Sequence, residues 1–292
     1  MEAAVLCSGS KGNCTLVRTA GMTVLIDVGM STKRYLVDSL AQFGCTIDDI
    51  DAVLVTHSHS DHVKQLKAVL GKPVYSWCPL DPGKCPAKGP AFQHYEILPW
   101  RTYTFKDLTV QTIALSHDSG KTLGFILLAD GEKLVYITDT GFVRQDAEPL
   151  LQNADYYILE SNHDPMMLEQ TRRPRVIKQR ILSAQGHLDN EYASRLLCRL
   201  LGKRTRKIVL AHLSEEANTP ELALETLQEI MEENHLDPAA FQIKTAEQYE
   251  PLVVAGFETH APDNPAEDSS APGAKPVRVP EPAQTAAPQR LN

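Results

Sequence analysis

The 292-residue sequence lacks the features of a membrane or exported protein. It contains no run of about 18 consecutive apolar residues, so a membrane-spanning helix is not expected. The beginning of the chain has no basic stretch leading into an apolar one, so it does not resemble a signal peptide. Six cysteines are scattered along the chain without the spacing of a disulfide framework. These absences predict a cytoplasmic protein.

One pair of cysteines, Cys78 and Cys85, lies within a turn-rich segment. Two thiols at this spacing are either reduced side chains or a clip for a stray metal ion. Two reduced thiols are the favoured interpretation.

Positive charge is scarce over most of the chain. The net charge is −8, which by itself argues against a nucleic acid partner. Residues 170–207, however, contain 11 basic and 2 acidic side chains, whereas the rest of the chain contains 18 basic and 35 acidic ones. This basic segment is interpreted either as a set of solvated helix faces or as a binding surface for a polyanion.

The last part of the sequence is poor in large apolar residues. From about residue 259 it is rich in proline and alanine, and it cannot bury enough surface to offset the entropy lost on ordering. The sequence therefore predicts one globular domain over residues 1–258 and a disordered tail over residues 259–292.

The globular part alternates strand and helix patterns. Apolar segments predict strands at 23–26, 52–55, 102–105, 108–115, 123–128, 134–138, 156–159 and 207–210. Helices are predicted after an N-cap at Ser31, after residue 62, over 176–184 and 190–201, and after Thr219 and Pro220. Asp130 and Gly131 predict a hairpin turn. The order favours an α/β fold with sheets packed face to face and helices outside.

The strongest functional signal is a cluster that follows the strand at 52–55. Within six residues it brings together four candidate metal ligands, His57, His59, Asp61 and His62. Side chains alternate along an extended chain, so His57 and His59 point the same way and can bind one ion together. Asp61 and His62 come where the chain turns into a helix, so they can serve a second ion. Such ligands suit zinc, manganese or iron.

Further ligands are expected at the ends of other strands, because a closed metal site needs ligands from several directions. His117, Asp139 and His212 each follow a predicted apolar strand. Any one of them alone could be an ordinary surface residue. Their shared position at the carboxyl ends of strands makes them the candidates that complete the site.

These motifs resemble those of the metallo-β-lactamase superfamily, and within it most closely the YycJ (WalJ) group of bacterial exonucleases. The resemblance rests on CSGSKGN at 7–13, HSDHVK at 59–64, SHD at 116–118, ITDTG at 137–141, LESNHD at 159–164, KQRIL at 178–182, GHL at 186–188 and LAHLS at 210–214. Together these stretches span the globular part. The departures are the tail and residues 78–90, which carry no predicted site residue.

The resemblance implies a four-layer αββα sandwich with two divalent metal ions, Zn²⁺ or Mn²⁺, at one edge. Carried over by position, one ion is expected to be held by His57, His59 and His117. The other is expected to be held by Asp61, His62 and His212, with Asp139 bridging the two. Asp27 is expected to orient this cluster without binding an ion.

The activity implied by the resemblance is 5′-to-3′ exonucleolytic cleavage of DNA, with a role in DNA repair. Two divalent ions lower the pKa of a shared water and clamp the attacking and leaving oxygens of a phosphodiester. His187 matches the histidine that nuclease members place beside the metals, where it would protonate the leaving oxygen or stabilise the charged phosphorane. His187 and Asp61 are thus the expected catalytic residues, and the basic segment would hold the phosphate backbone.

Contacts to the substrate are expected from two further places. The loop that contains Ser8, Ser10 and Asn13 offers backbone N–H groups and short polar side chains at a strand end, as a phosphate cradle does. The same loop can also be read as a tight turn. Asn162 and His163 follow another strand end and are expected to line the site.

The superfamily includes other activities, because a fold does not determine the substrate. Thioesterases of the glyoxalase II type share the histidine cluster but have no need of an arginine-rich segment or of His187. RNA-processing relatives with a large inserted cap need more than 100 residues between Asp139 and His187, whereas 48 separate them here. A non-catalytic scaffold would have lost ligands, and none is missing.

Overall fold

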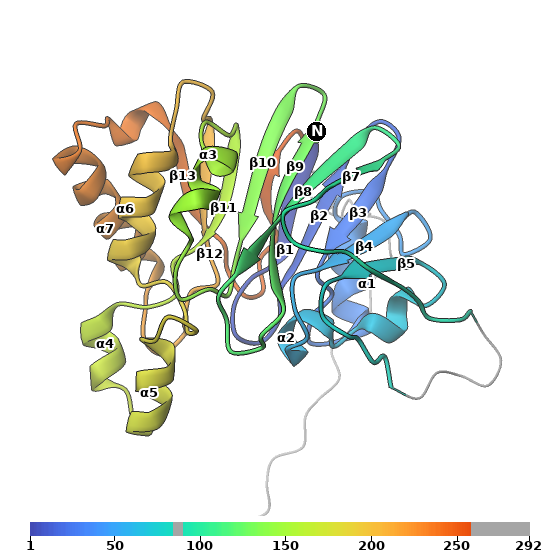
Figure 1. The fold of residues 1–292 in the computed structure, drawn as a ribbon, viewed down its shortest axis with the longest axis horizontal. Coiled ribbons are helices and arrows are strands. Elements are labelled where there is room, and N and C mark those ends of the chain that lie inside the picture. Colours follow the sequence, from blue (N-terminus) through green and yellow to red (C-terminus); the bar gives the residue numbers. More distant parts are fainter. Residues whose placement is uncertain (84–89, 258–292) are drawn as a thin grey trace, which may run out of the picture. The chain divides into compact units, whose positions relative to one another are not determined.

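Two seven-stranded sheets form the frame of the protein (Figure 1). The computed structural model describes residues 1–83 and 90–257, so Cys85 and the predicted tail lie outside the described residues. The first sheet has the order β14-β1-β2-β3-β4-β5-β6. Its strands are β1 (Glu2–Cys7), β2 (Cys14–Arg18), β3 (Thr23–Ile26), β4 (Ala52–Val55), β5 (Pro73–Ser76), β6 (Gln93–Glu96) and β14 (Leu252–Ala255).

The second sheet has the order β13-β12-β11-β10-β9-β8-β7. Its strands are β7 (Thr102–Phe105), β8 (Leu108–Leu115), β9 (Thr122–Ala129), β10 (Glu132–Ile137), β11 (Tyr156–Glu160), β12 (Lys207–Ala211) and β13 (Gln242–Thr245). The helices are α1 (Lys33–Ala41), α2 (Ser60–Val63), α3 (Glu148–Leu151), α4 (Pro165–Gln170), α5 (Arg175–Ile181), α6 (Asn190–Leu200) and α7 (Pro220–Glu233).

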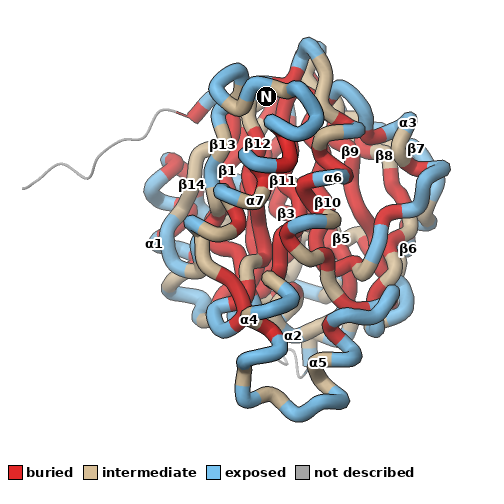
Figure 2. Tube along the Cα trace, turned by 90° about the vertical axis from the view of Figure 1, so that its left-hand side faces the viewer, coloured by how far each residue is buried: buried red, intermediate tan, exposed pale blue. Residues whose placement is uncertain are grey.

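Three apolar clusters separate four layers. The central cluster lies between the sheets and joins side chains such as Ile26 of β3 to Phe125 of β9. On the outer face of the first sheet, Leu36 and its neighbours on α1 pack against that sheet. On the outer face of the second sheet, α6 and α7 cover residues such as Tyr157. The predicted four-layer αββα sandwich is therefore confirmed, and Figure 2 shows the buried strands at its centre.

The central strands are buried on both faces, which explains why they are continuous apolar runs in the sequence. Strand β4 pairs in parallel with β3, and β11 pairs in parallel with both β10 and β12. Strands β8 and β10 each pair antiparallel with β9, so they run in the same direction. Parallel strands end at the same edge of their sheet, and the polar residues that follow them are gathered there.

Most of the predicted elements are present, with shifted ends. The turn at Asp130 and Gly131 joins β9 and β10, and both residues have positive φ angles of 54° and 71°, as a two-residue hairpin turn requires. The predicted N-cap Ser31 is wrong: the side chain of Thr32 accepts the hydrogen bond from Tyr35 N. The helix predicted after residue 62 is replaced by α2 and a separate 3₁₀ turn.

Among the described residues, no helix combines the length and the apolar character needed to cross a membrane.

Candidate metal centre and catalytic site

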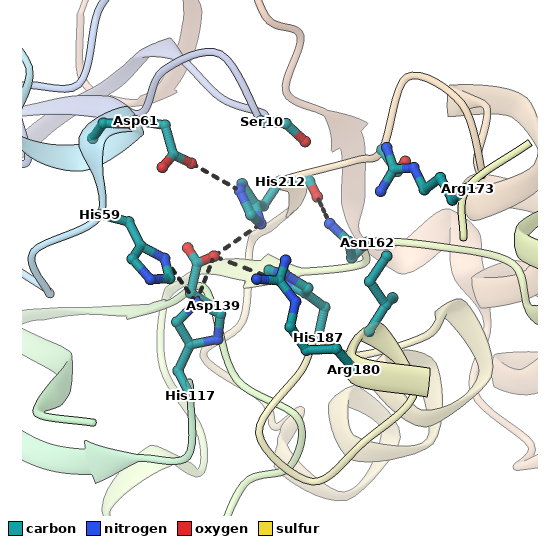
Figure 3. Close-up of a pocket in the computed structure, with 13 residues that line it drawn as sticks. Ser10, His59, Asp61, His117, Asp139, Asn162, Arg173, Arg180, His187 and His212 are labelled. Atoms are coloured by element: carbon teal, nitrogen blue, oxygen red, sulfur yellow. Dashed lines mark hydrogen bonds and ion pairs between the residues drawn. The ribbon is translucent and has the colours of Figure 1, made fainter. Parts of the chain in front are cut away.

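An open cleft of about 370 Å³ lies at the edge of the sheets where the parallel strands end. Figure 3 shows polar side chains from several separate segments pointing into this cleft. The residues that line it are Ser10, His59, Ser60, Asp61, His117, Asp139, Asn162, Arg173, Arg180, Ile181, His187, His212 and Ser214.

The first group of candidate ligands consists of His57, His59 and His117. One ring nitrogen of each lies within 4.8 Å of the others, and His59 Nδ1 is 3.3 Å from His117 Nε2. His57 Nε2 is buried and has no hydrogen-bond partner among the described residues. Leaving such a group unpaired costs about 1–3 kcal/mol. A metal ion would satisfy it, so these three rings fit a cation site.

The second group consists of Asp61, His62 and His212, which also offer ligand atoms within 4.8 Å of one another. Asp61 Oδ2 is 3.5 Å from His62 Nε2 and 3.8 Å from His212 Nε2. His212 Nε2 is buried and, within the described part of the chain, lacks a hydrogen-bond partner. His62 also lies close to His57, with ring centroids 4.1 Å apart, so the two groups adjoin and the assignment of each ligand to one ion stays a prediction.

Asp139 lies between these two groups. Its Oδ2 is 3.0 Å from His62 Nε2, and its Oδ1 is 3.7 Å from His117 Nε2. The φ angle of Asp139 is 58°, in the left-handed region, and Asp27 and His212 have φ angles of 61° and 57°. Non-glycine residues in this region are uncommon and concentrate at functional sites. Asp139 is therefore positioned as a bridging carboxylate would be, and its role as a ligand stays a prediction.

Asp27 is fully buried and contacts the candidate ligand His62. Its Oδ2 is 2.7 Å from His62 Nδ1, while its Oδ1 accepts a hydrogen bond of 2.8 Å from Thr56 N. The Thr56 hydroxyl donates to Asp27 Oδ2 at 2.9 Å. Such a carboxylate fixes the orientation of the ring and directs the opposite nitrogen, Nε2, toward Asp139 Oδ2 and the Asn13 amide. The expected orienting role of Asp27 agrees with this geometry.

The protonation states of the candidate ligands suit a cation only in part. Burial alone would lower the pKa of His62 and of His212, but neighbouring carboxylates outweigh it and raise both, that of His212 to about 10, so these two rings carry a proton that an ion would have to displace. Burial lowers the pKa of His57 and of His117, which keeps these rings neutral. Burial would raise the pKa of Asp139, but the neighbouring His212 and His62 outweigh it and hold that pKa well below its ordinary value. Neutral imidazole and ionised carboxylate are the forms that bind metal ions. Together with the unpaired nitrogens, this supports a metal centre of nitrogen and oxygen ligands.

Glu160 is a site residue that the sequence alone did not reveal. It is fully buried at the end of β11, and its Oε1 lies 2.8 Å from His187 Nδ1 and 2.9 Å from His212 Nδ1. Its Oε2 accepts hydrogen bonds from the backbone N–H groups of Thr140 and Leu188. Burial alone would raise the pKa of Glu160, but the nearby His187 and the contacts with the His187 and His212 rings lower it to about 2. One carboxylate thus orients both a candidate ligand and the candidate catalytic histidine.

The signal that could have found Glu160 was present in the sequence, since it follows a buried strand as Asp139 and His212 do. Asp118 was also missed as a site residue. Its Oδ1 is 3.3 Å from His117 Nε2 and 3.4 Å from His59 Nε2.

The predicted substrate contacts divide into two sets. Ser10 and Asn162 line the cleft. Ser8, Asn13 and His163 are buried and do not line it. Ser8 Oγ instead accepts a hydrogen bond of 2.8 Å from the backbone N–H of His212, and the Asn13 amide lies 3.1 Å from His62 Nε2. These two side chains therefore support candidate ligands from within the protein.

Neither ring nitrogen of His163 has a hydrogen-bond partner in the described part of the protein.

The basic segment also divides into two parts. Arg173 and Arg180 line the cleft. The distal part, residues 195–207, lies on α6 and in the loop up to the start of β12. Strand β12 reaches the site only at its carboxyl end. Several of its side chains are neutralised: Arg199 pairs with Glu148, and Arg206 pairs with Glu132. The ion pairs agree with the solvated-face interpretation for the distal part, and binding of a polyanion by the part beside the cleft stays a prediction.

Comparison with known proteins agrees with this arrangement. A family model described as the beta-lactamase superfamily domain matches residues 22–213, more than half of the chain. The chain belongs to the beta-lactamase superfamily. Among superfamily relatives, exodeoxyribonuclease WalJ of Streptococcus pneumoniae serotype 2 is 35% identical over 230 residues, covering 76% of this chain and 85% of that protein. Exodeoxyribonuclease YycJ of Bacillus anthracis is 35% identical over 237 residues, covering 78% and 88%.

A solved structure of the same superfamily fold shares the architecture. The metallo-beta-lactamase fold protein YhfI from Bacillus subtilis matches with a TM-score of 0.62 and 17% identity, covering 86% of this chain and 98% of that chain. This likeness concerns the fold alone. The sequence relatives confirm the predicted resemblance of this beta-lactamase superfamily member to the YycJ (WalJ) group.

Proposed function

We propose that this chain is a metal-dependent exonuclease that hydrolyses phosphodiester bonds of DNA. The observation that carries the proposal is the His187–Glu160 pair, held beside two groups of candidate ligands in a cleft that also contains Arg173 and Arg180. A thioesterase has no need of two guanidinium groups in its cleft. The relatives named exodeoxyribonucleases support the same substrate class.

The proposed cofactors are two divalent ions, Zn²⁺ or Mn²⁺. His57, His59 and His117 would hold one ion, Asp61, His62 and His212 would hold the other, and Asp139 would contact both. When bound, two such ions lower the pKa of water and neutralise charge on the phosphodiester. The buried unpaired nitrogens of His57 and His212 support this assignment.

His187 is the proposed general acid. Its Nδ1 is engaged by Glu160 Oε1 at 2.8 Å, which leaves Nε2 as the nitrogen able to give a proton to the leaving oxygen. Glu160 fixes the orientation of the His187 ring through this contact. Asp61, which lines the cleft beside His212, is the second residue proposed to act in the reaction.

Arg173 and Arg180 would bind phosphate groups that enter the cleft, since guanidinium groups recognise phosphate oxygens in a bidentate manner. Cleavage in the 5′-to-3′ direction and a role in DNA repair are parts of the proposal that rest on the resemblance to the YycJ (WalJ) group. A cytoplasmic location is proposed from the scattered cysteines, which lack the spacing of a disulfide framework. The proposed catalytic domain spans residues 1–258, and the remainder is proposed to be a tail.

The test is a cleavage assay with the purified full chain. Single- and double-stranded DNA and RNA, each labelled at the 5′ or the 3′ end, are incubated with Mn²⁺, Zn²⁺ or a chelator. We expect metal-dependent release of short products from DNA, beginning at the 5′ end. Absence of metal-dependent cleavage of every substrate would refute the proposed function.

A second measurement separates catalysis from metal binding. We expect the His187→Ala variant to retain two bound ions by elemental analysis and to lose most of its turnover. Loss of one ion in this variant would show that His187 is a ligand instead.

A further inference from the structure

The helices α4 and α5 form an arm, residues 165–182, that stands apart from the rest of the second sheet's helical layer. In Figure 1 the two helices lie below α6 and α7, beyond the carboxyl ends of β11 and β12. Their apolar contacts form a separate small cluster in which Leu168 and Ile181 pack against Ala217. The arm therefore has its own packing and is not an extension of the main core.

The foot of the arm, which is the loop at residues 183–187 after α5, contacts the candidate catalytic groups. The backbone N–H of His187 donates to the carbonyl oxygen of Ile181 at 3.0 Å, and His117 Nδ1 lies 3.1 Å from the carbonyl oxygen of Gly186. A Cβ atom placed on Gly141 would lie 2.4 Å from the Ser183 carbonyl oxygen, so the loop after Asp139 also touches this foot. The position of α5 relative to the cleft is thus determined by close contacts.

The arm carries a concentrated positive charge. Residues 165–182 contain five basic side chains and one acidic side chain. Arg172 and Arg175 have no ion-pair partner among the residues that the structure describes. Arg173 pairs with Glu216 at 2.8 Å. Lys178 and Arg180 also have acidic partners, Glu169 and Asp118, so what distinguishes the arm from the distal basic side chains is its place beside the cleft.

One ion pair links the arm to the metal centre. Arg180 Nη1 is 2.8 Å from Asp118 Oδ2, and the other oxygen of Asp118 is 3.3 Å from His117 Nε2. The Arg180 side chain is 50% exposed, whereas that of Asp118 is 24% exposed. Arg180 is thus held at the mouth of the cleft by a carboxylate and remains accessible to another anion.

We propose that the arm is a nucleic-acid-binding element in which Arg180 exchanges Asp118 for a backbone phosphate of the strand that enters the cleft. This inference rests on the proposed function and adds a contact surface and an exchange step to it. A phosphate diester is an anion with the geometry that a guanidinium group binds well, so it competes directly with the Asp118 carboxylate. Arg173 provides a second contact on the same side of the cleft.

Binding measured in the presence of a chelator tests the arm without cleavage. A fluorescent single-stranded oligonucleotide is titrated with wild type and with Arg180→Ala, Arg173→Ala and Arg199→Ala at several salt concentrations. For Arg180→Ala and Arg173→Ala we expect affinity to fall by about tenfold at low salt, and the salt slope to fall by about 0.7 for each arginine removed. Arg199→Ala, on α6 and paired with Glu148, is the matched control and should bind as wild type does.

The exchange step has its own signature. Replacing Asp118 by asparagine removes the competing anion, so Asp118→Asn should tighten binding several-fold, and this gain should largely vanish in the Arg180→Ala background. An equal gain in both backgrounds would overturn the exchange, because it would reflect general repulsion by Asp118. Weaker binding by Asp118→Asn would also overturn it.

The outcomes separate this inference from the proposed function. If wild type cleaves DNA but Arg180→Ala and Arg173→Ala bind with unchanged affinity and salt slope, the inference about the arm is wrong and the proposed function stands. If wild type neither binds nor cleaves nucleic acid, the proposed function itself fails.

Discussion

Replacement of Glu160 by glutamine tests whether one buried carboxylate controls both His187 and His212. The amide has the same shape but only one acceptor oxygen. If that oxygen stays with the Thr140 and Leu188 N–H groups, the NH₂ group faces the two Nδ1 atoms that Glu160 Oε1 now contacts at 2.8 and 2.9 Å. Both rings must then turn or change tautomer, which misdirects their Nε2 atoms.

The magnitude follows from the two hydrogen bonds between Glu160 and these rings. Each hydrogen bond to a charged group contributes about 1.5–3 kcal/mol, so removing both sets an upper range of about 3–6 kcal/mol. Allowing for partial relaxation, we expect kcat to fall by about 100- to 10,000-fold, which corresponds to about 3–5 kcal/mol. Metal affinity should fall by about 10- to 100-fold through His212, as is usual when a metal-binding histidine is deprived of its carboxylate partner.

The assay combines single-turnover cleavage of labelled DNA with metal analysis and thermal unfolding. Glu148→Gln is the matched control, because Glu148 pairs with Arg199 in the outer layer and contacts no candidate ligand. We expect Glu148→Gln to retain wild-type kcat and metal content. A Glu160→Gln variant with wild-type kcat and two tightly bound ions would refute the reasoning.

Three further predictions concern the frame of the site. Asp27→Asn should lower metal affinity by about 10- to 100-fold, measured by competition with a chelating dye, and unchanged affinity would contradict the orienting role of this carboxylate. In Gly29→Ala the new Cβ would lie 1.5 Å from the Asp61 carbonyl oxygen, so the melting temperature and the metal content should both fall. In the control Gly44→Ala the new Cβ meets nothing within 4 Å, so the free energy of unfolding should fall by only about 1–2 kcal/mol, the cost of a positive φ angle for alanine. Burial raises the pKa of the Cys7 and Cys14 thiols, so a thiol reagent should leave both unmodified in the native protein. Mass spectrometry measures the modification, and rapid labelling would disprove their burial.

The residues predicted best from sequence are those whose signal is local. His57, His117, Asp139 and His212 each follow an apolar run, and strand direction then brings them together at one edge. Glu160 follows the same rule, but its role depends on two histidines that are 27 and 52 residues away in the sequence, and no local pattern reveals such a contact.

Other features were hidden because they depend on packing between distant segments. The burial of Ser8 and Asn13 follows from their contacts with His212 and His62, so a loop that reads as an exposed phosphate cradle supports the centre from within. The basic segment reads as continuous, yet α6 carries its second half toward the opposite edge of the sheet, where β12 begins. The edge strands β6 and β13 were not predicted, because exposed positions interrupt the apolar run that marks a buried strand. Strands β1, β2, β5 and β14 were also not predicted.

The dispersal of the candidate ligands over many strand ends has a consequence for how the protein is made. A ribosome releases His57 to His62 long before His212, and β12 has to pair with β11 before His212 can reach the others. The nascent chain therefore exposes a partial set of ligands until the second sheet is assembled. Ion uptake by the proposed metal centre would then report completed long-range folding, and bound metal would serve as a marker of correctly folded protein during purification.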